Sequence, residues 1–115
     1  MSMDGATLDV ATADIATLRA ALDTGATTCT EVVLRLLERI ARYDRQGPRL
    51  NAVPELNPAL LEEARAADER RRRGAALGPL DGIPYLAKAS YAVRGLPVTS
   101  GSPAFERLIA RDDAY

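Results

Sequence analysis

The sequence contains no histidine, only one cysteine and only 4% aromatic residues. Without histidine these residues cannot form a Ser–His or Cys–His nucleophile pair, and Cys29 alone supports neither a disulfide framework nor a Cys/His zinc site. No stretch of about eighteen uncharged apolar residues is present, which excludes a transmembrane helix within these residues. The first ten residues lack the basic and apolar regions of a secretory signal, so we expect a cytoplasmic protein.

The length of 115 residues and the 47% apolar content fit one small globular domain, or a piece of a larger one. The net charge of −1 offers no broad field for nucleic acid or for an anionic membrane, so we expect neither as a partner. Of the 15 basic residues, Lys88 is the single lysine and the others are arginines. One lysine fits chance, but a buried lysine can lose its proton and an arginine effectively cannot.

Three helices are predicted in the first two thirds of the chain, over residues 12–24, 29–44 and 58–73. Each repeats apolar side chains at helical spacing, so each has one face suited to packing. The apolar positions are Ile15, Leu18, Ala21 and Leu22 in the first helix; Val33, Leu36, Leu37, Ile40 and Tyr43 in the second; and Leu60, Leu61, Ala64 and Ala67 in the third, with Asp68 on the same inner side.

Capping residues set the expected ends of these helices. Thr12 is placed to cap the first helix, and Gly25 to end it. Thr28 and Glu31 have the spacing of a capping box at the start of the second helix. Cys29 lies beside that cap with no basic residue next to it in sequence, so we interpret it as structural.

Four consecutive arginines, Arg70 to Arg73, end the third helix before Gly74. Cations at this end of a helix offset its dipole, and Asp68 or Glu69 lies within pairing distance in sequence. No aromatic residue is interleaved for base stacking. We therefore interpret the run as a solvated helix end and not as a nucleic-acid site.

The chain changes character after Gly78-Pro79. Residues 85–93 have no helical period and are largely apolar, which predicts a buried strand with Lys88 in its middle. A lysine in such a strand faces solvent, pairs with a carboxylate or is kept for chemistry, since a buried ammonium is costly. Ser102-Pro103 then has the form of a helix start, which predicts a helix over 103–110.

Four segments in this order resemble the amino-terminal part of amidase-signature hydrolases: TCTEVVLRLLERIARYDRQGPRLNAVPELNP, ALLEEARAADERRRRG, GPLDGIPYLAKASYAVRGLPVTSGSPAF and RDDAY. The resemblance spans roughly residues 12–115. Its most specific part runs from Gly78 to Ser102, where the family has a G-P-L-x-G-I-P turn, a strand that carries lysine, and then G-x-P-x-T-x-G-S. Each of these elements alone is weak evidence for the family, but their occurrence together in this order is strong evidence.

The resemblance implies an α/β fold in which helices surround a mixed β-sheet, with residues 1–115 as the N-terminal part of a single amidase domain. It implies hydrolysis of a carboxamide C–N bond by a nucleophilic serine, a second serine in a cis peptide, and a lysine. Matched to the family's motif, Lys88 is that catalytic lysine, which stays neutral and accepts a proton from the cis-serine. The expected substrate is a small-molecule amide, no metal or organic cofactor is implied, and a homodimer is left open.

Two departures from the family's pattern concern this site. The family usually follows its lysine with Asp-Asn-Ile, whereas this chain has Ala89-Ser90-Tyr91. The family's Gly/Ser-rich signature, with both serines and the oxyanion-hole amides, falls beyond Tyr115. We therefore expect these residues to supply the lysine but neither serine, and not to turn over an amide alone.

The sequence is compatible with two other functions. One is an ammonia-supplying glutaminase of the tRNA-dependent amidotransferase kind, which would need partner subunits. The other is a non-catalytic helical interaction module or truncated amidase, in which the helices over 12–24 and 29–44 pack on another chain and Lys88 is incidental. A Gly/Ser-rich stretch in the coding sequence after Tyr115 favours an enzyme, and a stop codon favours the module.

We predict that the isolated 115 residues are not stable as a compact monomer. One predicted strand without partners leaves apolar helix faces exposed, and exposed apolar faces favour association. Sedimentation velocity and thermal unfolding at several protein concentrations check this. A monomer with a cooperative transition that does not depend on concentration would contradict it.

Overall fold

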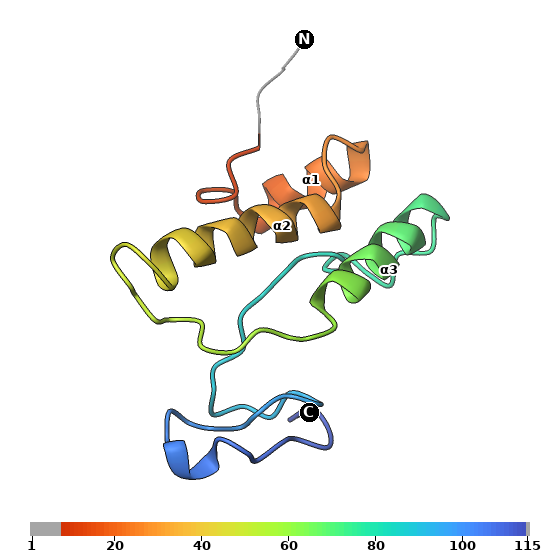
Figure 1. The fold of residues 1–115 in the computed structure, drawn as a ribbon. Coiled ribbons are helices and arrows are strands. Elements are labelled where there is room, and N and C mark those ends of the chain that lie inside the picture. Colours follow the sequence, from red (N-terminus) through yellow and green to blue (C-terminus); the bar gives the residue numbers. More distant parts are fainter. Residues whose placement is uncertain (1–7, 115) are drawn as a thin grey trace. The chain divides into compact units, whose positions relative to one another are not determined.

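The computed structural model describes residues 8–114, which divide into a helical unit ending at Pro84 and a second unit beginning at Tyr85 (Figure 1). Each unit is compact by itself. None of the helices in this range is long and apolar enough to cross a bilayer. The helical unit contains α1 (Ile15–Thr24), α2 (Cys29–Arg39) with a π-helical turn that continues it (Ile40–Asp44), and α3 (Leu60–Arg72).

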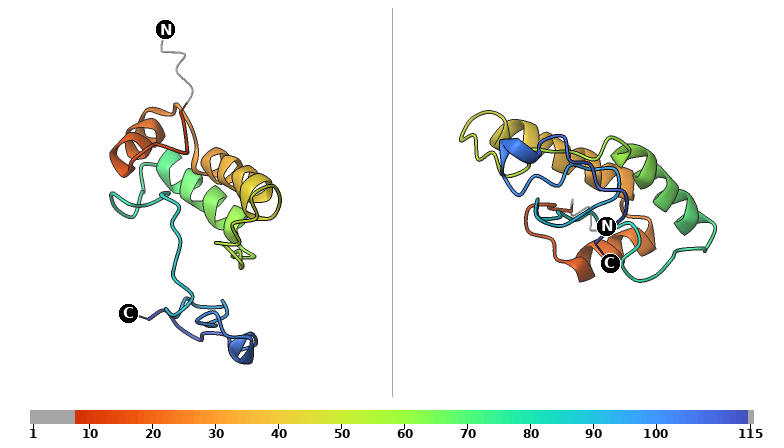
Figure 2. Two further views of the ribbon diagram at one scale, coloured as in Figure 1. Left: turned by 90° about the vertical axis from the view of Figure 1, so that its left-hand side faces the viewer. Right: turned by 90° about the horizontal axis from the view of Figure 1, so that it is seen from below.

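The core of the helical unit lies where α2 packs against α3, with the end of α1 beside them (Figure 2). Apart from Leu22 its buried side chains are small, and alanine on α3 lets α2 come close. The buried cluster consists of Leu22, Cys29, Val33, Ala64 and Ala67, and Leu37, Leu60, Leu61 and Ile83 pack partly against it. Many of the residues that the helical spacing predicted to face inward therefore do so.

Two residues of the predicted faces are not covered. Ile15 is 54% exposed and Tyr43 is 38% exposed, because α1 reaches the core only through its last turns and the helix after α2 changes to π geometry. Tyr43 instead lies beneath the guanidinium of Arg39, 5.1 Å from the ring centre. The prediction that both residues pack inward is therefore wrong for the described residues.

Asp14, and not Thr12, caps α1. The Asp14 carboxylate accepts a hydrogen bond of 2.7 Å from the backbone N–H of Thr17, which lowers the pKa of Asp14. Thr12 lies in the turn before the helix, where its backbone N–H bonds to the carbonyl of Asp9. At the other end Gly25 has a φ of +77°, the left-handed conformation that ends a helix and that glycine adopts without strain.

The N-terminus of α2 is capped twice. As predicted, the Thr28 hydroxyl accepts from the backbone N–H of Glu31, at 3.1 Å. Glu31 does not complete the capping box, because its carboxylate instead accepts from the hydroxyl of Thr27. The second cap comes from α3: Asp68 accepts from the N–H of Cys29 at 2.7 Å, and from the N–H and hydroxyl of Thr30 at 3.1 and 2.6 Å.

The π-helical turn brings the Asp44 carboxyl inward, and this residue is 5% exposed. Its two oxygens accept from the backbone N–H of Ala52, at 2.6 Å, and of Val53, at 3.2 Å. Its carbonyl accepts from the N–H of Asn51. The loop that leads to α3 is thus held to the end of the second helix through backbone groups.

The second unit corrects two predictions. Residues 85–93 form no strand within the described chain, because they meet too little partner backbone: Ala89 accepts from Ser100, and Ala92 accepts from Ala114. A strand needs a row of such bonds.

The helix predicted over 103–110 is a 3₁₀ turn, Pro103–Phe105, although Ser102 does cap it. The following residues pair in antiparallel fashion instead, with Leu108 and Ala110 bonded to Val98 and Leu96 around the bridge between Pro97 and Ile109. This competing pairing removes the residues that a longer helix would need.

We predict that Asp68→Asn destabilises the helical unit by about 1–3 kcal/mol, because an amide turns a donor toward N–H groups that need an acceptor. Urea unfolding followed by circular dichroism at matched protein concentration measures the change. Glu62→Gln on the exposed side of the same helix is the control and is expected to shift stability by less than about 0.5 kcal/mol. Equal effects of the two substitutions would contradict the role of Asp68.

Candidate functional site

The segment that resembles the family most closely begins with a turn that is fixed to α3. The Asp81 carboxylate accepts from Nε and Nη2 of Arg70, at 2.8 and 2.7 Å, and from the backbone N–H of Leu77 at 3.0 Å. The carbonyl of Asp81 accepts from Arg71, at 2.8 Å. A two-pronged arginine bond fixes orientation as well as distance, so this turn has one defined geometry.

The electrostatics of Asp81 follow from these contacts. The hydrogen bond from Arg70 lowers the pKa of Asp81 to about 2, against the opposing effect of burial. Its side chain is 8% exposed and that of Arg70 is 28% exposed. Asp81 and Arg70 therefore both stay ionised at neutral pH, although their side chains are largely shielded from solvent.

Gly82 and Ile83 complete the attachment of the turn. Gly82 has a φ of +88°, which an L residue adopts only with strain, and it lies against Leu22, Cys29 and Ala67 of the core. Ile83 packs on the same core. These contacts fix the backbone of the turn on the helical unit, which ends at Pro84.

Only two of the four consecutive arginines at the end of α3 form the solvated helix end that the sequence predicted. Arg72 and Arg73 pair with Glu69 on the surface, as predicted. Arg70 and Arg71 turn inward and bind Asp81, and Arg71 also pairs with Asp23. Sequence reasoning missed Asp81, whose only local signal was a single acid within a Gly/Pro turn.

Lys88 lies in the second unit, after Tyr85, Leu86 and Ala87. Its carbonyl accepts from the N–H of Tyr91 at 2.9 Å, and its side chain is exposed. Within residues 8–114 no hydrogen bond or ion pair involves its ammonium group. Tyr85 and Leu86 are 79% and 74% exposed, so the described residues do not themselves supply the apolar surroundings expected for Lys88.

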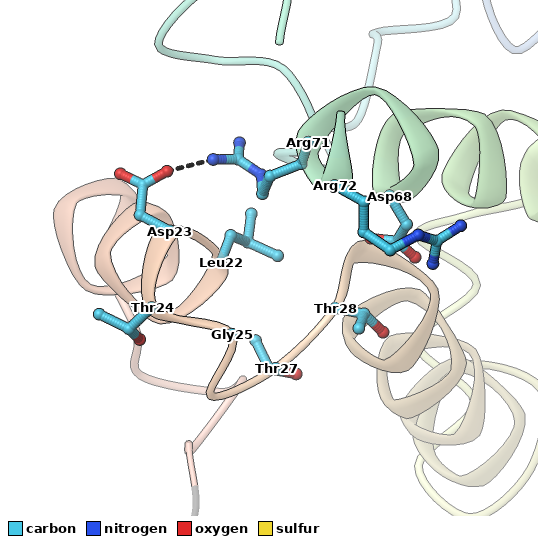
Figure 3. A pocket seen from close by; sticks show the side chains of 9 residues that line it. All are labelled: Leu22, Asp23, Thr24, Gly25, Thr27, Thr28, Asp68, Arg71 and Arg72. Carbon is cyan, nitrogen blue, oxygen red and sulfur yellow. Dashed lines mark hydrogen bonds and ion pairs between the residues drawn. The ribbon is translucent and has the colours of Figure 1, made fainter. Parts of the chain in front are cut away.

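A cavity of about 290 Å³ lies between the loop that joins α1 to α2 and the end of α3 (Figure 3). Its charged side chains already have partners: Asp68 caps α2, Arg71 pairs with Asp23, and Arg72 pairs with Glu69. Across the described part of the chain, no group of three or more cysteine or acidic side chains could hold a metal ion. We therefore interpret the cavity as part of the contact between the helices and not as a ligand site.

Cys29 is buried in the core of the helical unit, and burial is the largest cause that raises the pKa of its thiol to about 11. The nearby carboxylates of Asp68 and Asp81 raise it further. The thiol is protonated at neutral pH and is therefore a weak nucleophile. This environment agrees with the structural interpretation of Cys29.

Comparison with known proteins identifies the class. The family model described as Amidase matches residues 31–115. The chain is 33% identical over 107 residues to a glutamyl-tRNA(Gln) amidotransferase protein of Bdellovibrio bacteriovorus, an alignment that covers 93% of this chain and 21% of that protein. It is 38% identical over 96 residues to indoleacetamide hydrolase of Bradyrhizobium diazoefficiens, covering 83% and 18%. The chain belongs to the amidase-signature family.

Solved structures agree with this assignment. The native peptide amidase of Stenotrophomonas maltophilia matches with a TM-score of 0.85 and 42% identity, over 90% of this chain and 21% of that one. An amidase family protein of Bacillus anthracis matches with a TM-score of 0.83 and 32% identity over the same shares. The predicted fold class is confirmed: these residues form an N-terminal portion of the α/β amidase fold, and they span about a fifth of the length of such relatives.

We predict that Asp81 makes stability depend on pH in acid. Its pKa is lower in the folded chain, about 2, than the ordinary 3.8, so its stabilisation is complete above about pH 4 and is lost as the pH falls toward 2. The stability difference between the parent and Asp81→Asn should shrink across that window in urea unfolding at pH 2 to 6. The difference for the Glu62→Gln control should change less, and a pH-independent difference for Asp81→Asn would refute the prediction.

Proposed function

We propose that these residues are the N-terminal part of an amidase that hydrolyses a carboxamide C–N bond, with Lys88 as its general base. The observation that carries the proposal is the coincidence of the only lysine with the lysine position of the motif that runs from Gly78 to Ser102. That motif lies inside the region matched by the family model. The hydrolases among the relatives, indoleacetamide hydrolase and peptide amidase, support an amide substrate.

In this mechanism the neutral amine of Lys88 accepts a proton from the family's cis-serine, which in turn takes one from the nucleophilic serine. The nucleophile attacks the amide carbon, the C–N bond breaks, and the proton relayed through Lys88 leaves with the amine or ammonia. Water then hydrolyses the acyl-serine ester and restores the starting protonation states. The arrangement provides an activated nucleophile without histidine, which agrees with a region that contains none.

A neutral lysine at working pH requires an environment that disfavours its charge. Ala89, Ser90 and Tyr91 bring no carboxylate next to Lys88, whereas the family's usual sequence brings an aspartate. That environment has to come from residues outside this chain segment, since Tyr85 and Leu86 are exposed.

A second candidate is a glutaminase that supplies ammonia within a tRNA-dependent amidotransferase. The similarity to the amidotransferase protein of Bdellovibrio bacteriovorus favours it. Such a glutaminase would use the same Lys88 chemistry on glutamine and would require partner subunits. Hydrolysis of simple amides by the purified protein alone, without partners, distinguishes a free-standing amidase from this second candidate.

We predict that Lys88→Arg in the intact protein folds and binds substrate but loses at least about a hundredfold in turnover. Guanidinium keeps the positive charge and stays protonated, so it can replace a structural cation but cannot act as a base. Steady-state kinetics on an amide substrate measure the change, with binding checked by calorimetry. Arg72→Lys, in an exposed ion pair of α3, is the control and should leave the rate unchanged. Turnover within a few-fold of the parent would show that Lys88 is not the base.

A further inference from the structure

We infer that Ser100 is a positioning residue for Lys88, and that it acts through its backbone and not through its hydroxyl group. Both residues, and the contacts that join them, belong to the second unit. The inference rests on the proposed function, because it gives the backbone of Ser100 an effect on the reaction of Lys88. Ser100 itself contacts no substrate in this role.

Few backbone hydrogen bonds hold the segment around Lys88. The carbonyl of Lys88 accepts from the N–H of Tyr91, at 2.9 Å, which closes a turn. The carbonyl of Ala89, the next residue, accepts from the N–H of Ser100, at 3.1 Å. Among the described residues, no other hydrogen bond involves the segment 85–91. The bond from Ser100 is therefore the hydrogen bond that ties the turn at Lys88 to the rest of the second unit.

Ser100 lies in a tight turn whose backbone conformation is unfavourable for serine. The turn is closed by the N–H of Ser102, which donates to the carbonyl of Thr99 at 2.8 Å. The two residues at its centre, Ser100 and Gly101, have φ values of +49° and +77°. Turns with two positive φ values favour glycine and asparagine at both positions. Gly101 meets this preference, whereas Ser100, which has a Cβ atom, adopts the conformation only with strain.

Neighbouring side chains fix this turn on both sides. The hydroxyl of Thr99 accepts from the N–H of Gly101, at 3.2 Å. The hydroxyl of Ser102 accepts from the N–H of Ala104, at 3.3 Å, and so caps the 3₁₀ turn. Strained backbone that is maintained by its surroundings is typical of functional sites. A different φ at Ser100 would change the turn, and with it the direction of the N–H that bonds next to Lys88.

The alternative is that the turn only closes the antiparallel pairing that flanks it. That pairing has backbone hydrogen bonds of its own, between Gly95 and Ala110, Leu96 and Ala110, and Val98 and Leu108. The N–H of Ser100 takes no part in them and donates to Ala89, outside the paired segments. If the turn served the pairing alone, substitutions at Ser100 would change stability and leave the turnover of folded protein unchanged.

The test uses the intact protein with substitutions that differ in how well they tolerate a positive φ. Ser100→Val and Ser100→Thr introduce β-branched side chains, which resist this conformation. Ser100→Thr keeps the hydroxyl and remains informative where Ser100→Val fails to fold. Ser100→Gly and Ser100→Asn tolerate the conformation and lack the hydroxyl.

Arg49→Val is the matched control for backbone strain. Arg49 also has a positive φ, +51°, but it lies in a loop of the helical unit. Turnover is expressed per mole of folded protein, with the folded fraction measured by circular dichroism under assay conditions. Loss of folded protein therefore does not lower the value.

We expect Ser100→Val to lower kcat about ten- to a hundredfold with KM within a few-fold, because small misplacements of a catalytic group have effects of that size. Ser100→Thr should lower kcat by a smaller factor. Ser100→Gly and Ser100→Asn should restore kcat to within a few-fold of the parent, and Arg49→Val should lower stability without changing kcat. Equal losses of kcat in Ser100→Gly and Ser100→Val would overturn the inference, because they would assign the effect to the hydroxyl.

Lys88→Arg in the same assay distinguishes failure of the positioning role from failure of the proposed function. If Ser100→Val and Ser100→Thr keep the parent's kcat while Lys88→Arg is inactive, the positioning role is wrong and the base assignment stands. If Lys88→Arg is active, the base assignment is wrong, and the positioning role falls with it.

Discussion

Asp68 on α3 satisfies the first amides of α2, and this contact compensates for a core built from small side chains. Alanine, valine and cysteine bury little area each, so they bring α2 and α3 close without fixing their register strongly. A carboxylate on the positive end of a helix supplies both direction and register. Further along α3, Arg70 and Arg71 donate to Asp81. A single helix thus holds both the start of α2 and the turn at Asp81 through hydrogen bonds.

Local signals predicted the three helices well, and long-range contacts account for the errors. Apolar periodicity and the glycine stops at Gly25 and Gly74 depend on neighbours in sequence, which the pattern contains. Thr12 was predicted to cap α1, whereas Asp14 does so; both residue types cap helices well and the two lie within one turn of each other, so the sequence alone did not decide between them. The strand expected over residues 85–93 depends on partner backbone that the described residues do not provide, so no local pattern could have decided it.

The site was predictable only in part, for a similar reason. Lys88 stood out because it is the only lysine and because of the motif around it, and both signals are contained in the sequence. Asp81 carried no such signal, since its significance comes from two arginines on another element. The solvated helix end inferred for the arginine run was reasonable for Arg72 and Arg73, which remain exposed. For Arg70 and Arg71, the burial of their partner decided the outcome.

The hydrogen bonds of Asp44 affect which sequence changes the loop after α2 can tolerate. Its carboxylate holds the following loop by the backbone N–H groups of Ala52 and Val53, and every residue except proline offers such a group. These two bonds therefore constrain the side chains of Ala52 and Val53 only weakly, whereas the number of residues in the loop and the glycine at Gly47, with a φ of +55°, are constrained strongly. Among natural variants, substitutions should be common at the two bonded positions, with proline avoided there, and insertions or deletions in the loop should be rare.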